Sequence, residues 1–154
     1  PMAKNRATKP GRILCYIDLS EHSTDLVGYA FEYARLFEAE LFVLHSVTDI
    51  SKAAGFYVPH INTEVLEDEV IKAARDKMYA LCHKAVGDEV DAEHRLVTKG
   101  NPVEEINRLI SEKKIDLLIM SHEVSKGSLF GFRNDHVERF MKDAVIPFMI
   151  VPVR

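Results

Sequence analysis

Five short apolar segments, separated by stretches of helical periodicity, limit the possible folds of this sequence more than any other feature. The segments are 13–17, 41–47, 90–96, 115–120 and 147–153. Most of them are nearly continuous apolar runs, which are typical of parallel strands buried on both faces. Between the segments, apolar residues recur every three or four positions, as on one face of a helix. Strands that alternate with helices predict an α/β domain with a parallel sheet and right-handed crossovers.

Four helices are expected to connect these strands. They are predicted to begin near residues 20–23, at Glu64, at Pro102 and at Asn134 or Asp135. Each helix follows one strand and a final strand ends the chain, so the sequence predicts a three-layer, doubly wound sheet of five parallel strands.

The polarity of each segment also bears on strand order. Segment 13–17 is short and wholly apolar, whereas 90–96 alternates apolar and polar residues. We therefore expect the first strand at the centre and the third at an edge, in a flavodoxin-like arrangement. Pro152 removes a ladder donor, so the last strand is also expected at an edge or beside a special partner.

Length, charge and cysteine content restrict the class of protein. The 154 residues fit one domain, expected to span 12–154 after a loosely ordered segment 1–11. The net charge of −4 argues against nucleic acid as a partner. No run approaches the roughly 18–20 apolar residues of a membrane span, and the polar start is not typical of a signal peptide. Cys15 and Cys82 lack metal-ligand spacing and are expected to be buried thiols, which indicates a cytoplasmic protein.

The topology predicts where a ligand would bind. In doubly wound sheets, ligands lie beyond the carboxyl ends of the strands, where the strand order reverses. Here that means the ends of strands one and four, marked by Asp18 and by a loop starting at Ser121. The helix beginning near Asn134 would point its N-terminus at the same crevice, where backbone N–H groups favour an anion.

Several segments, in order along the chain, resemble the universal stress protein family. They are 13–23, 44–47, 97–102, 116–122, 137–139 and 144–147. The resemblance implies the same five-stranded sheet, of the adenine nucleotide alpha hydrolase-like type, and a homodimer joined through the last strands. In ATP-binding members of the family a glycine-rich loop holds the phosphates. Asp18 matches the family's nucleotide-contacting aspartate, and Ser121 and His122 match the two residues between the first two loop glycines.

The departures from the family pattern fall on the glycines. Met120 and Glu123 stand where the first two loop glycines belong, and Asn134 and Asp135 replace the final Gly-Ser pair. Leu19 replaces a residue that is often glycine. Glycine lets backbone N–H groups approach a phosphate and permits positive φ, and two carboxylates near the phosphates add repulsion. We therefore predict that ATP binding is weak or lost.

Two features would reverse this prediction. Mg²⁺ could bridge the carboxylates and the phosphates of ATP, and the loop could follow another path through Gly127 and Gly131. In that path Lys126 or Arg133 would contact the phosphates, although both are also typical of solvated surface charges.

Each candidate residue could also have a purely structural role. Asp18 could cap the turn before the first helix, and His122 could be a loop residue bonded to backbone. His45, at a strand end, is typical of a satisfied core histidine. The remaining histidines show no metal-ligand spacing, so no metal site is expected.

The leading hypothesis is a non-catalytic stress-response protein that acts as a homodimer. The dimer is expected to form through Phe148–Val151, an apolar segment that would otherwise be an unpaired, aggregation-prone strand edge. The alternative is an ATP-binding switch or slow ATPase that uses Asp18, the Ser121–Arg133 loop and Mg²⁺. A phosphoacceptor receiver domain is disfavoured, because Val97-Thr98 at the end of the third strand offers no carboxylate. A flavodoxin-like electron carrier is disfavoured, because no phosphate-binding run of Ser and Thr follows the first strand.

Overall fold

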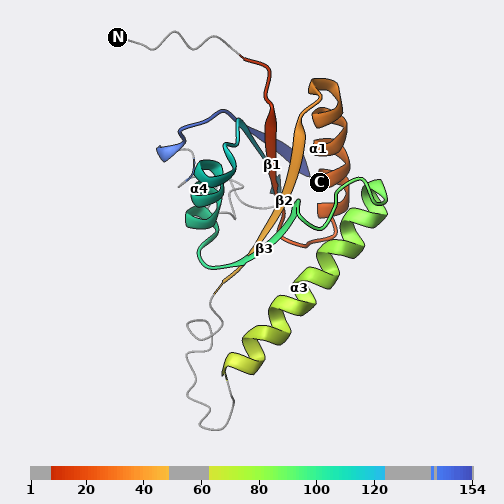
Figure 1. The fold of residues 1–154 in the computed structure, drawn as a ribbon, viewed down its shortest axis with the longest axis vertical. Coiled ribbons are helices and arrows are strands. Elements are labelled where there is room, and N and C mark those ends of the chain that lie inside the picture. The colour runs from red at the N-terminus through yellow and green to blue at the C-terminus, as the bar shows by residue number, and fades with distance from the viewer. Residues whose placement is uncertain (1–7, 49–62, 124–139, 141, 154) are drawn as a thin grey trace.

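The protein forms an α/β fold with three layers (Figure 1). The computed structural model describes residues 8–48, 63–123, 140 and 142–153. Its elements are β1 (Arg12–Tyr16), α1 (Ser23–Phe37), β2 (Glu40–Val47), α3 (Thr63–Val86), β3 (Arg95–Lys99), α4 (Pro102–Lys113), β4 (Leu117–Glu123) and β5 (Phe148–Val153). In the described part of the chain, no helix has an apolar stretch long enough to span a membrane.

All five strands pair in parallel, in the order β3-β2-β1-β4-β5. The predicted central position of β1 and edge position of β3 are confirmed. The flavodoxin-like order is wrong, because in that order the third strand lies between the first and the fourth. An inner strand of that kind is buried, whereas Arg95–Lys99 is only partly buried.

The third strand begins later than its apolar alternation predicts. Val90 lies in a bend and His94 in a turn, and β3 starts at Arg95. Val90 is buried, at 2% exposure, but its backbone is not in the ladder. Asp91 shapes this turn by accepting hydrogen bonds from the N–H groups of Glu93 and His94 at 3.0 and 3.1 Å. The prediction started the strand too early because Val90 is apolar and buried, although it lies outside the strand.

Three helices are described where the sequence predicts four. The expected helix from Asn134 or Asp135 lies outside the described residues, except that Phe140, Lys142 and Asp143 are helical. Helix α4 begins as predicted at Pro102, because the side chain of Asn101 accepts hydrogen bonds from the N–H groups of Val103 and Glu104.

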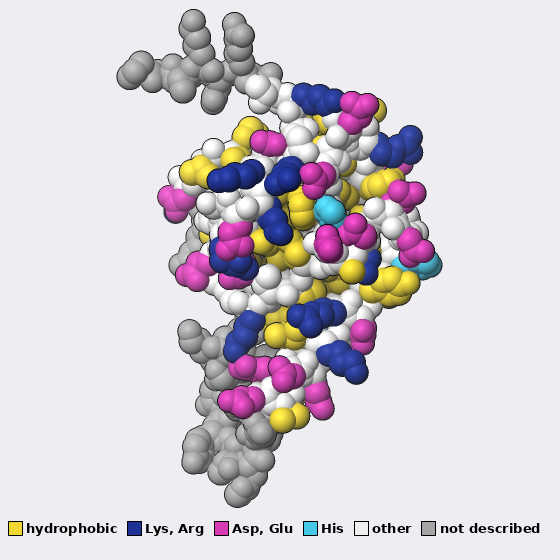
Figure 2. Space-filling view, viewed as in Figure 1, with side chains coloured by type: hydrophobic (Ala, Val, Ile, Leu, Met, Phe, Trp, Pro, Cys, Tyr) yellow, Lys and Arg dark blue, Asp and Glu magenta, His cyan; other side chains and the backbone are white. Residues whose placement is uncertain are grey.

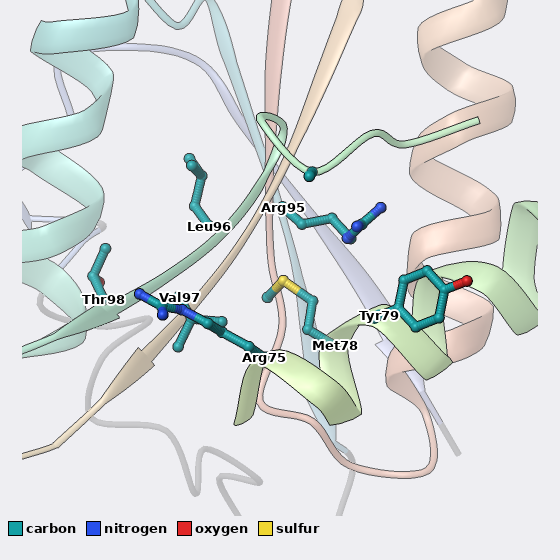
Figure 3. A pocket seen from close by; sticks show the side chains of 8 residues that line it. Arg75, Met78, Tyr79, Arg95, Leu96, Val97 and Thr98 are labelled. Carbon is teal, nitrogen blue, oxygen red and sulfur yellow. The ribbon is translucent and has the colours of Figure 1, made fainter. Parts of the chain in front are cut away.

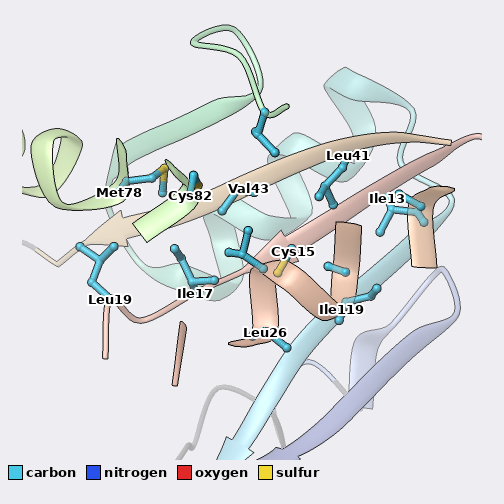
Figure 4. Close-up of a cluster of buried hydrophobic side chains, with 14 of the residues drawn as sticks. Ile13, Cys15, Ile17, Leu19, Leu26, Leu41, Val43, Met78, Cys82 and Ile119 are labelled. Carbon is cyan, nitrogen blue, oxygen red and sulfur yellow. The ribbon is translucent and has the colours of Figure 1, made fainter. Parts of the chain in front are cut away.

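The helices cover both faces of the sheet. Helices α1 and α3 pack on one face, where Cys15 and Cys82 lie in a shared apolar cluster with Ile17 and Leu26 (Figure 4). Helix α4 packs on the other face, in a second cluster that includes Phe140. Burial raises the pKa of the Cys15 thiol, and it raises that of Cys82 to about 11. Both cysteines are free and buried, as predicted.

Strand β5 ends the sheet opposite β3, with β4 as its neighbour. Leu118 donates its N–H to the carbonyl of Pro147. In a parallel ladder this fixes the direction of the next amides: those of Met149 and Val151 point to β4, and those of Phe148 and Ile150 point outward. The backbone nitrogen of Pro152 also points outward. The proline therefore removes an N–H donor from the outer edge of β5 and none from the ladder with β4.

Candidate functional site

The site predicted from topology lies where β1 and β4 end side by side. Tyr16 of β1 pairs with Met120 of β4, and the strand order reverses at β1. Asp18 follows β1, and Ser121 and His122 belong to the end of β4. The structure thus brings the three predicted residues to one edge of the sheet, the edge at which doubly wound folds bind ligands.

Asp18 holds the turn that leads into α1. Its side chain is exposed, and its Oδ1 accepts hydrogen bonds from the N–H of Ser20 at 2.9 Å and from the hydroxyl of Ser23 at 3.1 Å. Partial burial works against the charged form, but these hydrogen bonds outweigh it and lower the pKa of Asp18. Asp18 is therefore an ionised acceptor whose Oδ1 stabilises the start of α1.

Tyr16 lies just before this turn, and its side chain is on the face of the sheet that α4 covers. Burial and, second, the charge of Asp18 raise the pKa of Tyr16 to about 12. The phenol is therefore neutral at physiological pH, and it packs against the α4 side of the core.

Ser121 and His122 are strand residues, and the prediction that a loop starts at Ser121 is wrong. They pair with Val151 and Pro152, and β4 continues to Glu123. The ladder with β5 extends past the apolar run, because hydrogen bonding between neighbouring strands does not require apolar side chains. Both residues are half-buried.

The residue at the first replaced glycine position is part of the core. Met120 is 3% exposed and packs in the cluster on the α4 face. Neither Met120 nor Glu123 has a positive φ. The side chain of Glu123 lies outside the described residues, as do Lys126, Gly127, Gly131, Arg133, Asn134 and Asp135. The predictions made for these residues therefore remain predictions.

Leu19 adopts a backbone conformation that favours glycine. Its φ is +61°, in the left-handed region, and its side chain is buried at 8% exposure in the α1–α3 cluster. For an L-residue with a Cβ, this conformation costs roughly 1–2 kcal/mol. Burial of the leucine side chain compensates for that cost. The sequence marked this position only as one that is often glycine in the family.

Two contacts that the sequence did not indicate hold neighbouring strand ends together. His45 Nδ1 lies 2.8 Å from the carbonyl oxygen of Ile17, and the hydroxyl of Ser46 donates to the carbonyl of Gly100 at 2.8 Å. These bonds join β2 to the turns after β1 and β3. His45 thus has the structural role that was expected of it, and Ser46, at 4% exposure, is satisfied in the core.

A pocket of about 350 Å³ opens beside this edge, between the end of β2 and α3. Most of its wall is apolar, and Lys77 and His45 add polar groups. Its lining residues are Leu19, His45, Ser46, Val47, Thr48, Val70, Ala73, Ala74 and Lys77. Sequence analysis missed Lys77, because helical periodicity does not show which polar residue of α3 borders a pocket. Across the residues that the structure describes, no three His, Cys, Asp or Glu side chains are grouped to hold a metal ion.

Solved structures share this fold. The hypothetical protein MJ0577 aligns with a TM-score of 0.71 and 18% identity, over 96% of this chain and 99% of that one. A universal stress protein in complex with cAMP aligns at 0.67 and 18% identity, over 94% and 98%. UspA from Lactobacillus plantarum aligns at 0.59 and 15% identity, over 94% and 99%. These identities support the fold alone.

The sequence itself was compared with protein families and with curated proteins. No curated protein matches it. Residues 10–152 match the universal stress protein family, and this match covers nearly the whole chain, including β1 to β4 and all of β5 except Val153. The chain therefore belongs to the universal stress protein family.

Proposed function

We propose that this chain is a non-catalytic stress-response protein that acts as a homodimer and binds ATP weakly or not at all. The observation that carries the proposal is the course of β4 through the positions where ATP-binding relatives have glycine. Met120 is buried in the core, and the backbone runs extended to Glu123. An extended strand does not form the concave nest of N–H groups that holds a phosphate.

The acidic side chains add to this argument. Glu123 and Asp135 would bring carboxylates toward the phosphates of a bound ATP. Like charges about 4 Å apart cost on the order of 4 kcal/mol at an effective dielectric near 20. Each 1.4 kcal/mol is about tenfold in affinity, so one such approach would abolish micromolar binding.

Isothermal titration of the full chain with ATP and Mg²⁺ tests this proposal. The parent chain should give no saturable heat up to millimolar ATP. A variant that restores three of the four loop positions, with Glu123→Gly, Asn134→Gly and Asp135→Ser, removes both carboxylates and should bind ATP at least about tenfold more tightly. Saturable micromolar binding by the parent would overturn the proposal.

A second candidate is an ATP-binding switch or slow ATPase that uses Asp18, the Ser121–Arg133 loop and Mg²⁺. The pocket of about 350 Å³ beside Leu19 and Lys77 favours it, because an apolar wall with one ammonium group suits a purine next to an anion. A similar structure is a complex with cAMP. Freshly purified protein that releases a nucleotide on denaturation would support this candidate over the first.

A further inference from the structure

A groove follows the free edge of β3 at one end of the sheet. In the described chain, β3 pairs with β2 alone. Because Val43 donates its N–H to the carbonyl of His94, the backbone groups of Arg95 and Val97 point to the outer edge. The N–H of Arg95 donates to the carbonyl of Asp91, which leaves the N–H of Val97 and the carbonyls of Arg95 and Val97 for a further strand. Next to that edge lies a pocket of about 420 Å³, walled by α3 on the other side (Figure 3). Its lining residues are Arg75, Met78, Tyr79, Ala92, Arg95, Leu96, Val97 and Thr98.

The groove runs along the edge of the strand and is not confined to one face of the sheet. Arg95, Leu96, Val97 and Thr98 are consecutive, and all four line it. Successive side chains of a strand point to opposite faces. Val97 indeed packs on the α1–α3 side and Leu96 on the α4 side. A pocket that contacts all four residues must therefore include the exposed backbone edge.

Two arginines lie at different ends of the groove. Figure 3 shows Arg75 reaching from α3 toward Thr98, and Arg95 turned toward Tyr79. The guanidinium carbon of Arg95 lies 5.0 Å from the centre of the Tyr79 ring, and Nη1 of Arg95 donates to the carbonyl of Val90. The side chain of Met78, 1% exposed, lies between the two arginines.

Both arginines lack a carboxylate partner within the described residues, unlike other cations nearby. Lys99 contacts Glu67 at 2.6 Å, and Arg108 is held between two glutamates. In the space-filling view, Lys and Arg side chains lie beside hydrophobic surface over α3 and the neighbouring part of β3 (Figure 2). The groove thus combines positive charge, an apolar floor and open backbone groups at Arg95 and Val97.

We propose that this groove binds an acidic, extended peptide segment of a partner protein, which adds to the sheet as a strand beside β3. Main-chain hydrogen bonds to the edge would supply affinity, as in other cases of strand addition. Carboxylates at alternate positions of the peptide would face Arg75 and Arg95, whose planar guanidinium groups suit bidentate pairing. Apolar side chains on its other face would cover Leu96.

The groove is long enough for this geometry. Arg95 and Thr98 are three residues apart, about 10 Å along a strand, and alternate side chains of a peptide are about 7 Å apart. A peptide with an acidic residue at every second position therefore places at least two carboxylates within the groove. A peptide with lysine at those positions would meet two guanidinium groups and be repelled.

The test measures binding of a fluorescein-labelled heptapeptide of alternating Glu and Val to the full chain, by fluorescence anisotropy. Saturable binding is expected, and Arg75→Glu should weaken it about tenfold or more. Arg35→Glu is the matched control: it makes the same charge change on an exposed part of α1 and should leave binding within twofold. The alternating Lys and Val peptide should not bind.

A second measurement separates strand addition from simple charge attraction. Methylation of the peptide amides that face β3 should abolish binding, whereas methylation of the other set should not. Arg75 is exposed, so its variants should fold; Arg75→Gln repeats the test with a smaller change. Absence of saturable binding, equal loss in Arg35→Glu, or equal binding of both methylated peptides would overturn the proposal.

Discussion

Leu19 combines a strained backbone conformation with a well-packed side chain. At a φ of +61° a leucine is strained, yet its side chain reaches the cluster between the sheet, α1 and α3. A glycine here would relieve the strain and leave the cluster less filled. The sequence identified the position as a departure from the family, but the sign of φ follows from the turn between β1 and α1 and could not be predicted from the residue alone.

This argument predicts an unusual order of stability for two variants of Leu19. Both Leu19→Ala and Leu19→Gly should be less stable than the parent, because each removes a buried side chain. Alanine keeps the Cβ that strains the left-handed backbone, so Leu19→Gly should be the more stable of the two by about 1 kcal/mol. Urea unfolding of the three proteins measures the order, and a more stable alanine variant would contradict the strain.

Asp18 illustrates what the sequence alone leaves open at a site residue. Both interpretations of it, turn cap and ligand contact, were compatible with the sequence, and the structure shows the first through Ser20 and Ser23. Lys77, by contrast, was not indicated at all. It borders the pocket at the carboxyl edge because of where α3 crosses the sheet, which is a property of tertiary packing.

Among the elements, strands were predicted well where one continuous apolar run covers the whole paired segment. Apolar runs located β1, β2 and β5 to within a residue or two. The predicted bounds were wrong where the paired segment differs from the apolar run. Strand β4 extends through polar residues 121–123, and β3 is Arg95–Lys99, a segment with few apolar residues. Pairing with a neighbour set these bounds, and a single sequence does not show which strands are neighbours.

His94 joins the turn before β3 to the start of β2. Its Nδ1 lies 2.6 Å from Asp91 Oδ1, its Nε2 lies 3.3 Å from Glu40 Oε2, and Arg12 approaches Glu40 at 3.4 Å. The ring also packs against Phe42 in a tilted arrangement, with centroids 4.6 Å apart. A neutral imidazole has one N–H, so both carboxylates are satisfied only by the protonated ring. Burial opposes that charge, but these bonds outweigh it and raise the pKa of His94 above its ordinary 6.5.

The raised pKa predicts that His94 stabilises the β2–β3 edge in acid more than in base. Its contribution is complete below about pH 6.5 and is lost as the pH rises through the higher folded value. At the acid limit it fails again, because the lowered pKa of Asp91 means that its pairing is lost below about pH 4. His94→Gln should therefore be most destabilising between these limits, as measured by urea unfolding across pH.

The double variant checks the cause of this pH dependence. In an Asp91→Asn, Glu40→Gln background the ring faces no carboxylate, so replacing His94 should have a smaller effect that varies little with pH. An unchanged pH profile in that background would assign the effect to packing on Phe42 instead.

At the scale of the whole molecule, the free edge of β5 predicts how two copies would join. The outward amide of Ile150 lies at the middle of that edge, and Pro152 limits pairing toward the end. Ile150→Pro removes this outward donor without touching the ladder to β4, so it should give a folded monomer, whereas the parent is expected to be a dimer. Ile150→Val keeps the donor and should remain dimeric. Sedimentation velocity at micromolar concentration measures both, and a dimeric Ile150→Pro would exclude this interface.

The sheet ends in β3 on one side and in β5 on the other. This difference determines how many partner segments a dimer could bind. If copies join through β5, the combined sheet terminates in a β3 strand at each extremity. Two identical grooves would then face away from the twofold axis, too far apart for one short peptide to fill both. A partner with two acidic segments on a long tether would be captured with avidity, and one with a single segment would exchange freely.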